Sequence, residues 1–269
     1  MIQLVDQKIF DTGVHRCLCS MDFSDRTAVV TGAARGVGEG IANGLAEQGV
    51  DIVIADIDTE GASEVANAIQ DRYDVKAVGI ECDVTEFDST KQMATKAIEE
   101  MGQIDILVNN AGYWTTKPFA KMSPDEWKRD LEICLEGSIH CTKSLLDHMI
   151  ENSYGRVVNI VSDAGRIGEP HLSVYSGAKS GVIGFGRALS KEVAQFDITV
   201  NNLALGVTET PGSKDFIESF GKENLEAQYP MGRLGEIDDA ITGTLFFAQD
   251  DARYITGQTI SVSGGYTTV

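Results

Sequence analysis

The stretch that decides the fold is Ala28-Val29-Val30-Thr31-Gly32-Ala33-Ala34-Arg35-Gly36-Val37-Gly38. It joins a short apolar run to a glycine-rich turn with the spacing Gly-x3-Gly-x-Gly, and a helix-like segment, 38–48, follows. Glycines in such a turn let the backbone approach a pyrophosphate, which the N–H groups and dipole of the helix N-terminus then stabilise. A glycine-rich turn alone is also compatible with an ordinary tight turn, so the rest of the chain decides between the two.

Short apolar runs alternate with longer amphipathic segments along the rest of the chain. Runs of this kind are typical of strands buried on both faces, and their alternation with helices favours a parallel sheet with right-handed crossovers. We therefore predict an α/β fold: one doubly wound domain over residues 23–269, with about seven parallel strands, preceded by an extension over residues 1–22 of unknown role. The predicted strands are 28–30, 52–55, 77–80, 104–108, 157–161, 198–203 and 259–262. The predicted helices are 38–48, 61–73, 89–101, 124–150, 173–195 and 236–249.

The charge balance argues against nucleic acid as a partner. Lys and Arg number 22 and Asp and Glu number 41, which gives a net charge of −19 over 269 residues. Sequence-independent binding to phosphate backbones needs the opposite sign. There is also no run of about 18 apolar residues, so we expect no membrane-spanning helix.

The cysteines and the N-terminal stretch indicate a reducing, cytoplasmic location. Five cysteines are an odd number in a chain too long to need a disulfide framework. Cys17 and Cys19 form an isolated Cys-x-Cys without further ligands nearby, so we expect no metal site. Residues 1–22 have no continuous apolar core, so we expect that they are not a secretory signal. The residues that interrupt such a core are Asp6, Lys8, Asp11, His15 and Arg16.

Asp56 stands at the end of the second predicted strand, 18 residues after Gly38. A carboxylate in this place accepts hydrogen bonds from the adenosine ribose hydroxyls and repels a 2′-phosphate. The sequence therefore favours NAD over NADP, and Arg35 in the glycine turn is the one residue that would soften this preference. The other interpretation of Asp56 is a carboxylate that caps a helix.

Four motifs, which occur in order along the chain, narrow the possible function. They are Thr31-Gly32-x3-Gly36-x-Gly38, Asn109-Asn110-Ala111-Gly112, Ser162 and Tyr175-x3-Lys179. Together they resemble the short-chain dehydrogenase/reductase family, from about Phe23 to the C-terminus. The resemblance implies a Rossmann fold and hydride transfer at a nicotinamide cofactor.

The catalytic chemistry can also be argued from the residues. Tyr175 and Lys179 are four apart and share a helix face. A phenol has a pKa of about 10, and we expect the ammonium and the positive ring of an oxidised nicotinamide to lower it. Tyr175 would then take the proton of an alcohol as a general base, and Ser162 would hold the substrate oxygen. By resemblance, Lys179 also hydrogen-bonds the nicotinamide ribose.

Further roles follow from the resemblance alone. It implies that Asp83 lies near the adenine and that Val207 and Thr210 contact the nicotinamide carboxamide. It also implies a homo-oligomer, a tetramer or dimer, formed through helices 124–150 and 173–195 and the last strand. The predicted cofactor-binding residues are Gly32, Arg35, Gly36, Val37, Gly38, Asp56, Asp83, Val84, Asn110, Ala111, Gly112, Tyr175, Lys179, Val207 and Thr210.

Two positions depart from the family pattern. Cys134 stands where the family carries an active-site asparagine that helps keep a water linking the lysine to solvent. A thiol is a poorer hydrogen-bonding group than an amide, although a main-chain carbonyl could hold the same water. We include Cys134 in the catalytic group and interpret it as a small buried thiol, not a nucleophile. Leu205 replaces the usual proline after the sixth strand.

The predicted substrate lid is Thr208–Tyr229. Its residues Phe216, Ile217 and Phe220, together with Tyr113, Trp114, His171 and Leu172, indicate an apolar or ring-containing secondary alcohol as the small-molecule substrate. The alternative is that these side chains only pack the lid against the core.

Two competing functions remain. The first is an NADPH-dependent 3-oxoacyl-carrier-protein-type reductase, which the segment Tyr229–Gly235 also resembles; Asp56 and the acidic surface argue against it. The second is a catalytically impaired cofactor-binding subunit, suggested by Cys134 and Leu205 and opposed by the presence of Ser162, Tyr175 and Lys179.

Overall fold

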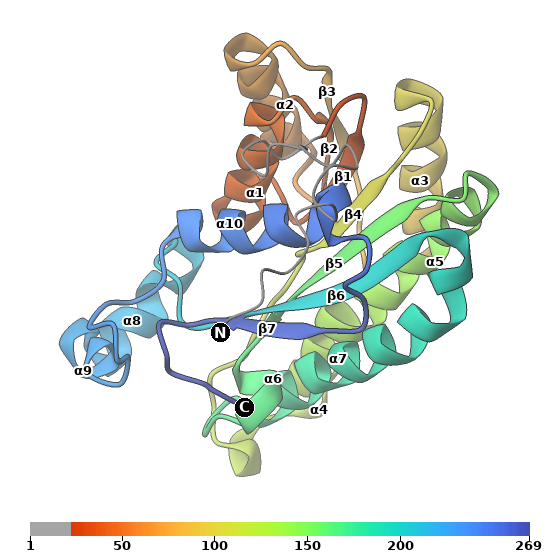
Figure 1. Ribbon diagram of the computed structural model, residues 1–269. Helices are drawn as coiled ribbons and strands as arrows, with labels where there is room; N and C mark the ends of the chain where they lie inside the picture. Colours follow the sequence, from red (N-terminus) through yellow and green to blue (C-terminus); the bar gives the residue numbers. More distant parts are fainter. Residues whose placement is uncertain (1–22) are drawn as a thin grey trace, which may run out of the picture.

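A parallel sheet forms the centre of the computed structural model, which describes residues 23–269 (Figure 1). Its seven strands lie in the order β3-β2-β1-β4-β5-β6-β7, and every neighbouring pair is parallel. The strand order reverses between β1 and β4, which is where ligands bind in open α/β sheets. The predicted doubly wound Rossmann fold is confirmed, whereas the extension and its Cys17 and Cys19 lie outside the described residues. The strands are β1 (Thr27–Thr31), β2 (Asp51–Asp56), β3 (Ala77–Glu81), β4 (Ile106–Asn109), β5 (Gly155–Ser162), β6 (Ile198–Leu205) and β7 (Thr259–Val262).

Helices cover both faces of the sheet. The main ones are α1 (Gly36–Glu47), α2 (Thr59–Arg72), α3 (Phe87–Met101), α4 (Pro124–Leu131), α5 (Gly137–Glu151), α7 (Ser173–Val193) and α10 (Ile237–Ala248). Successive strand residues point to opposite faces: Val30 packs in the cluster of α1, α2 and α10, and Val29 packs in the cluster of α3, α5 and α7. Both faces are therefore apolar, which explains the continuous apolar runs in the sequence. None of the helices in this part of the chain is long and apolar enough to cross a membrane.

The segment 124–150, predicted as one helix, is interrupted. Helix α4 begins behind a capping box at Ser123 and Glu126, and one wide turn of π-helix, Glu132–Glu136, separates it from α5. The N–H of Gly137 donates to the carbonyl of Glu132 in this turn. Gly137 itself packs so closely on Val84 that a β-carbon would lie 2.8 Å from Val84 Cγ2. The extra residue in the turn reflects packing between distant segments, which a helical periodicity does not reveal.

The predicted lid is helical and has a small core of its own. It contains α8 (Lys214–Phe220) and α9 (Lys222–Glu226), which project together away from the sheet (Figure 1). Ile217 is buried there with Leu225, Tyr229 and Leu234, so this residue packs the lid. Phe220 is 41% exposed. Ile217 therefore packs the lid, as the alternative interpretation of these residues predicts.

A charged cluster closes the opposite edge of the sheet, at the amino ends of β1 and β5. The ring of Tyr154 lies between two guanidinium groups, 3.7 Å from that of Arg26 and 4.3 Å from that of Arg156. The Tyr154 hydroxyl donates to Asp250 Oδ1 at 2.6 Å, and Arg26 pairs with the same carboxylate at 3.0 Å. Arg156 is only 1% exposed, so its charge depends on these partners.

Candidate active site

The glycine turn between β1 and α1 has the open backbone that a phosphate group needs. Gly32 and Gly36 have φ values of +62° and +65°, a region that favours glycine. A β-carbon at Gly32 would lie 2.7 Å from Ala111 Cα, whereas one at Gly36 would meet nothing closer than Thr210 Cβ at 3.9 Å. Arg35, which is exposed, precedes α1 without capping it through its side chain. The first N–H groups of α1 are thus left without a side-chain cap.

The end of β4 is bound to this turn by Asn110. Its side-chain amide donates to the carbonyls of Thr31 and Gly32, both at 2.9 Å. In return, Thr31 Oγ1 accepts from the N–H of Asn110 at 3.0 Å and from that of Ala111 at 3.1 Å. The Asn110 amide, predicted to line the cofactor, therefore shapes the glycine turn. The sequence predicted no role for Thr31. Its position directly before the first glycine of the turn is the sequence feature that could have indicated one.

Asp56 lies at the carboxyl end of β2, beside the same turn. Its Oδ2 accepts from the N–H of Ala34 at 2.9 Å, and its Oδ1 accepts from that of Asp58 at 3.0 Å. The helix cap of α2 is Asp58, which accepts from the N–H of Gly61 at 3.0 Å. The helix-capping interpretation therefore belongs to Asp58 and not to Asp56.

The next strand end contributes Asp83 and Val84. Asp83 Oδ1 accepts from the N–H of Thr85 at 2.9 Å and from its hydroxyl at 2.7 Å. Val84 is buried and packs on Gly137. Its carbonyl lies 3.0 Å from Nδ1 of His140 on α5. Asp83 thus lies in a rigid turn, at the same edge of the sheet as Asp56.

Ser162, Tyr175 and Lys179 come together where β5 ends and α7 begins. Lys179 is 4% exposed, and its Nζ donates to the carbonyl of Ile160 in β5 at 2.8 Å. The same Nζ lies 5.8 Å from the centre of the Tyr175 ring. Ser162 ends β5, and its Oγ accepts from the N–H of Ala164 at 3.1 Å. A β-carbon at Gly112 would lie 3.7 Å from Lys179 Nζ, so the segment after β4 also reaches this group.

Without a dinucleotide, the pKa of Tyr175 lies above the ordinary value of a phenol. Burial raises the pKa of this phenol well above its ordinary value, and the neighbouring Cys134 and Asp130 raise it further. A hydrogen bond with Ser162 acts in the opposite direction. Burial also lowers the pKa of Lys179. In the protein alone, desolvation therefore outweighs any lowering of the phenol pKa by the lysine.

Cys134 lies in the π turn and is fully buried. Its thiol donates to the carbonyl of Tyr113 at 3.0 Å, and the N–H of Tyr113 donates back to Sγ at 3.5 Å. Burial raises the pKa of the thiol, although the nearby Lys179 lowers it. A buried thiol with a raised pKa is a poor nucleophile. The geometry gives Cys134 a structural contact with the segment after β4.

Val207 and Thr210 follow β6, and Thr210 Cβ lies 3.9 Å from the place of a β-carbon at Gly36 in the glycine turn. Thr210 Oγ1 accepts from the N–H of Ser213 at 3.2 Å and so caps a short turn. The N–H of Val207 donates to the hydroxyl of Tyr229 at 2.8 Å. Tyr229 was not predicted to act here, and its role depends on the fold of the lid.

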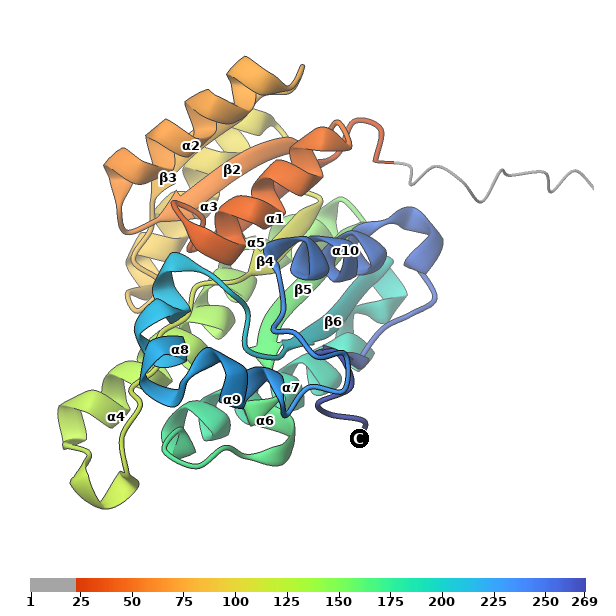
Figure 2. The same ribbon diagram turned by 90° about the vertical axis from the view of Figure 1, so that its left-hand side faces the viewer.

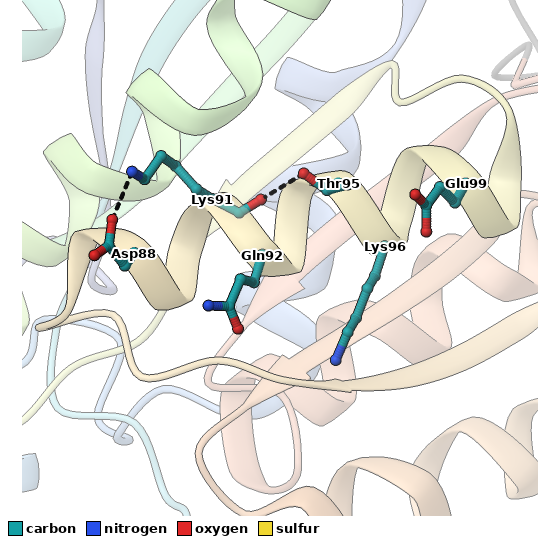
Figure 3. A pocket seen from close by; sticks show the side chains of 6 residues that line it. All are labelled: Asp88, Lys91, Gln92, Thr95, Lys96 and Glu99. Carbon is teal, nitrogen blue, oxygen red and sulfur yellow. Dashed lines mark hydrogen bonds and ion pairs between the residues drawn. The ribbon is translucent and has the colours of Figure 1, made fainter.

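Two shallow depressions lie away from these residues. One runs along an exposed face of α3, and Figure 3 shows that its side chains all come from this helix. Lys91 there pairs with Asp88, as on an ordinary solvated helix face. The other lies at the β3 edge of the sheet, between α2 and α3. Neither depression contains a residue of the predicted site.

Comparison with known proteins identifies the family. The family model described as Enoyl-(Acyl carrier protein) reductase matches residues 32–267. The chain is 38% identical over 245 residues to (2S)-[(R)-hydroxy(phenyl)methyl]succinyl-CoA dehydrogenase subunit BbsD of Thauera aromatica, covering 91% of this chain and 98% of that protein. The chain belongs to the short-chain dehydrogenase/reductase family.

Other members of the family are similarly close. This dehydrogenase/reductase is 36% identical over 245 residues to 3-oxoacyl-[acyl-carrier-protein] reductase FabG of Escherichia coli K12, with 91% of this chain and 98% of that protein covered. A solved structure from Sinorhizobium meliloti 1021, described as a short-chain alcohol dehydrogenase, has a TM-score of 0.87 at 33% identity. The alignment covers 91% of this chain and 97% of the chain of that structure. The protein is therefore an oxidoreductase for alcohol- or ketone-type substrates, in a family that uses nicotinamide cofactors.

The residues present fit a nicotinamide dinucleotide. The turn at Gly36 leaves room for a phosphate, and α1 begins there without a side-chain cap. Asp56 lies next to the turn, and Gly112 leaves space beside Lys179. The glycine turn, Asp56 and Asp83 would hold the adenosine and pyrophosphate, and Lys179, Val207 and Thr210 would hold the nicotinamide half.

Proposed function

We propose that this protein is an NAD-dependent dehydrogenase that interconverts a secondary alcohol and its ketone, with Tyr175 as the general acid/base. The proposal rests on the group formed by Ser162, Tyr175 and Lys179 at the carboxyl edge of the sheet. Ser162, whose hydroxyl can hold a substrate oxygen, lowers the pKa of this phenol, and an ammonium lies 5.8 Å from the centre of the phenol ring.

The residues of this group divide the chemistry between them. Bound NAD supplies the acceptor for the hydride of the carbinol carbon. Tyr175 takes the hydroxyl proton as the carbonyl forms, and Ser162 keeps the oxygen in place. Lys179, anchored on the carbonyl of Ile160, is held beside Tyr175, where it would hydrogen-bond the nicotinamide ribose. In reduction, Tyr175 returns the proton to the ketone oxygen.

The raised pKa of Tyr175 gives the proposed reaction a pH dependence. The protonated phenol is the form that donates in reduction, and the phenolate is the form that accepts in oxidation. We therefore expect the oxidation rate to rise with pH through the neutral range and the reduction rate to fall at high pH. Oxidation and reduction rates that do not change with pH would contradict the acid/base role.

The choice of NAD rests on Asp56. Its carboxylate is fixed beside the glycine turn by two backbone N–H groups, where it would repel a 2′-phosphate. The relationship to FabG supports the competing NADPH-dependent reductase. Turnover with each of the four dinucleotides separates the two: we expect NAD(H) to be preferred and Asp56→Ser to weaken that preference. A wild type that prefers NADPH would overturn the argument from Asp56 and favour the competing reductase.

The proposed substrate carries an apolar ring near the reacting carbon. Trp114 supports this, because the centre of its ring lies 6.1 Å from that of Tyr175. The name of the BbsD relative describes a substrate with a phenyl group next to its hydroxyl, which is also consistent. Oxidation of cyclic, aromatic and hydroxyacyl secondary alcohols with NAD would identify the class.

Tyr175→Phe tests the catalytic role directly. We expect turnover to fall by about 10²–10⁴-fold while NAD binding persists. Tyr254→Phe is the matched control, because Tyr254 is fully exposed. Unchanged turnover in Tyr175→Phe would refute the proposal, and a wild type that binds NAD but oxidises no alcohol would favour the impaired subunit. The homo-oligomeric state and the cytoplasmic location stay predictions.

A further inference from the structure

Asp130 is a buried carboxyl for which the proposed chemistry has no use. It is 0% exposed and is the only buried residue of α4, a helix that projects from the body of the molecule (Figure 2). Within residues 23–269 it forms no ion pair, and both of its oxygens bind one residue. Oδ1 accepts from the hydroxyl of Thr115 at 3.0 Å, and Oδ2 accepts from the N–H of Thr115 at 3.3 Å. An apolar side chain would fill this place at a lower desolvation cost.

Cys134 holds the same segment one helical turn later. Its thiol bonds both the carbonyl and the N–H of Tyr113. Asp130 near the end of α4 and Cys134 in the π turn therefore hold two residues of the same segment, Thr115 and Tyr113. Trp114 lies between these two anchored residues.

The anchored segment brings Trp114 to the catalytic tyrosine. The rings of Trp114 and Tyr175 have their centres 6.1 Å apart and are inclined by 57°, a favourable geometry for aromatic contact. Helix α4 also packs against α7, which carries Tyr175. The position of this indole thus depends on the hydrogen bonds that fix the residues on either side of it.

We propose that Asp130 is a positioning residue that, through Thr115, holds the Trp114 ring beside Tyr175 as one wall of the substrate cleft. The indole is a flat apolar surface beside the ring of Tyr175, so the wall favours substrates with a ring on the carbinol carbon over open-chain ones. The inference rests on the proposed function, because it assigns the substrate class of that same site.

The charge of Asp130 is consistent with this arrangement. Burial raises its own pKa, although the hydrogen bonds from Thr115 and the charge of Arg129 lower it. Glu126 faces it from the same helix and raises its pKa further. In its ionised form Asp130 also raises the pKa values of Tyr175 and Cys134. A substitution of Asp130 therefore changes both the position of Trp114 and the pKa of Tyr175. A substitution of Thr115 leaves the carboxyl in place and tests the position of Trp114 alone.

The test compares Thr115→Val with Thr115→Ser. Valine removes the hydroxyl but keeps the shape and the backbone N–H, whereas serine keeps the hydroxyl. We expect Thr115→Val to raise the KM for a cyclic secondary alcohol by about tenfold, the equivalent of one hydrogen bond. The KM values for an open-chain alcohol and for NAD should change little, and Thr115→Ser should resemble the wild type. A uniform loss for all substrates, or no loss, would overturn the proposal.

A second measurement does not depend on turnover. In a Trp127→Phe background, Trp114 is the only tryptophan of the chain. We expect acrylamide to quench its fluorescence more strongly when Thr115 is valine than when it is threonine or serine. Equal quenching would refute the positioning role. If the wild type oxidised no secondary alcohol, the proposed function would fail, while the quenching would still decide whether Asp130 and Thr115 hold the indole.

Discussion

Gly36→Ala separates the binding role of the glycine turn from its conformational role. The backbone at Gly36 has φ +65°, and an added methyl group would meet nothing closer than Thr210 Cβ at 3.9 Å. The substitution therefore costs backbone strain without a steric clash inside the protein. The methyl group would occupy the space through which a pyrophosphate approaches the N-terminus of α1.

Gly49 supplies the matched control. It lies in the turn between α1 and β2, has φ +85°, and has no atom within 4 Å of the place of its β-carbon. An alanine in the left-handed region costs about 1–2 kcal/mol at either position. For a chain of this size, this corresponds to a loss in Tm of about 2–8 °C. Both variants should therefore lose similar stability.

The two variants should differ in dinucleotide binding. Loss of one hydrogen bond between a backbone N–H and a phosphate is worth about 1.5–3 kcal/mol, a weakening of about 10–150-fold. We expect this in Gly36→Ala and unchanged affinity in Gly49→Ala, measured by calorimetric titration with NAD and with thermal unfolding as the stability control. The reasoning would be refuted if Gly36→Ala bound NAD like the wild type, or if Gly49→Ala lost as much affinity.

Three further predictions concern side chains. Cys134→Asn should retain or raise activity, because an amide can both donate to and accept from the Tyr113 backbone; a steady-state assay that shows complete loss would contradict the interpretation of the thiol as structural. Asp250→Asn should lower the free energy of unfolding by about 2 kcal/mol in urea at neutral pH, because a charge near buried Arg156 is lost. Burial alone would raise the pKa of Asp250, but the hydrogen bonds from Tyr154 and Arg26 lower it. The stabilisation by Asp250 is therefore present above the pKa of the unfolded chain and is lost as the pH falls through the lower pKa of the folded protein. The unfolding free energies of the variant and the wild type should converge below about pH 4. Asp130→Asn should move the acid limb of the pH–rate profile for alcohol oxidation to lower pH, because loss of a negative charge near Tyr175 lowers the pKa of its phenol. An acid limb at the same pH as in the wild type would show that Asp130 is neutral in the folded protein.

The sequence alone was sufficient to predict the sheet and the edge at which the residues of the candidate site lie. Most strands contain a run of neighbouring apolar residues, and the carboxyl ends of parallel strands meet at one edge whatever the details of packing. Asp56 and Ser162 could therefore be placed at that edge because each ends a strand. Tyr175 and Lys179 could be paired because four residues make about one helical turn.

Only the tertiary structure decided which groups these side chains meet. The amide of Asn110 could have faced the cofactor, but the folded chain brings it to the carbonyls of Thr31 and Gly32 at the start of the glycine turn. The pKa of Tyr175 is raised mainly by burial, which segments distant in sequence provide. Thr115 meets Asp130 only because the segment after β4 packs on α4. Periodicity and spacing are properties of the local chain, whereas hydrogen-bond partners and desolvation depend on every segment that surrounds a group.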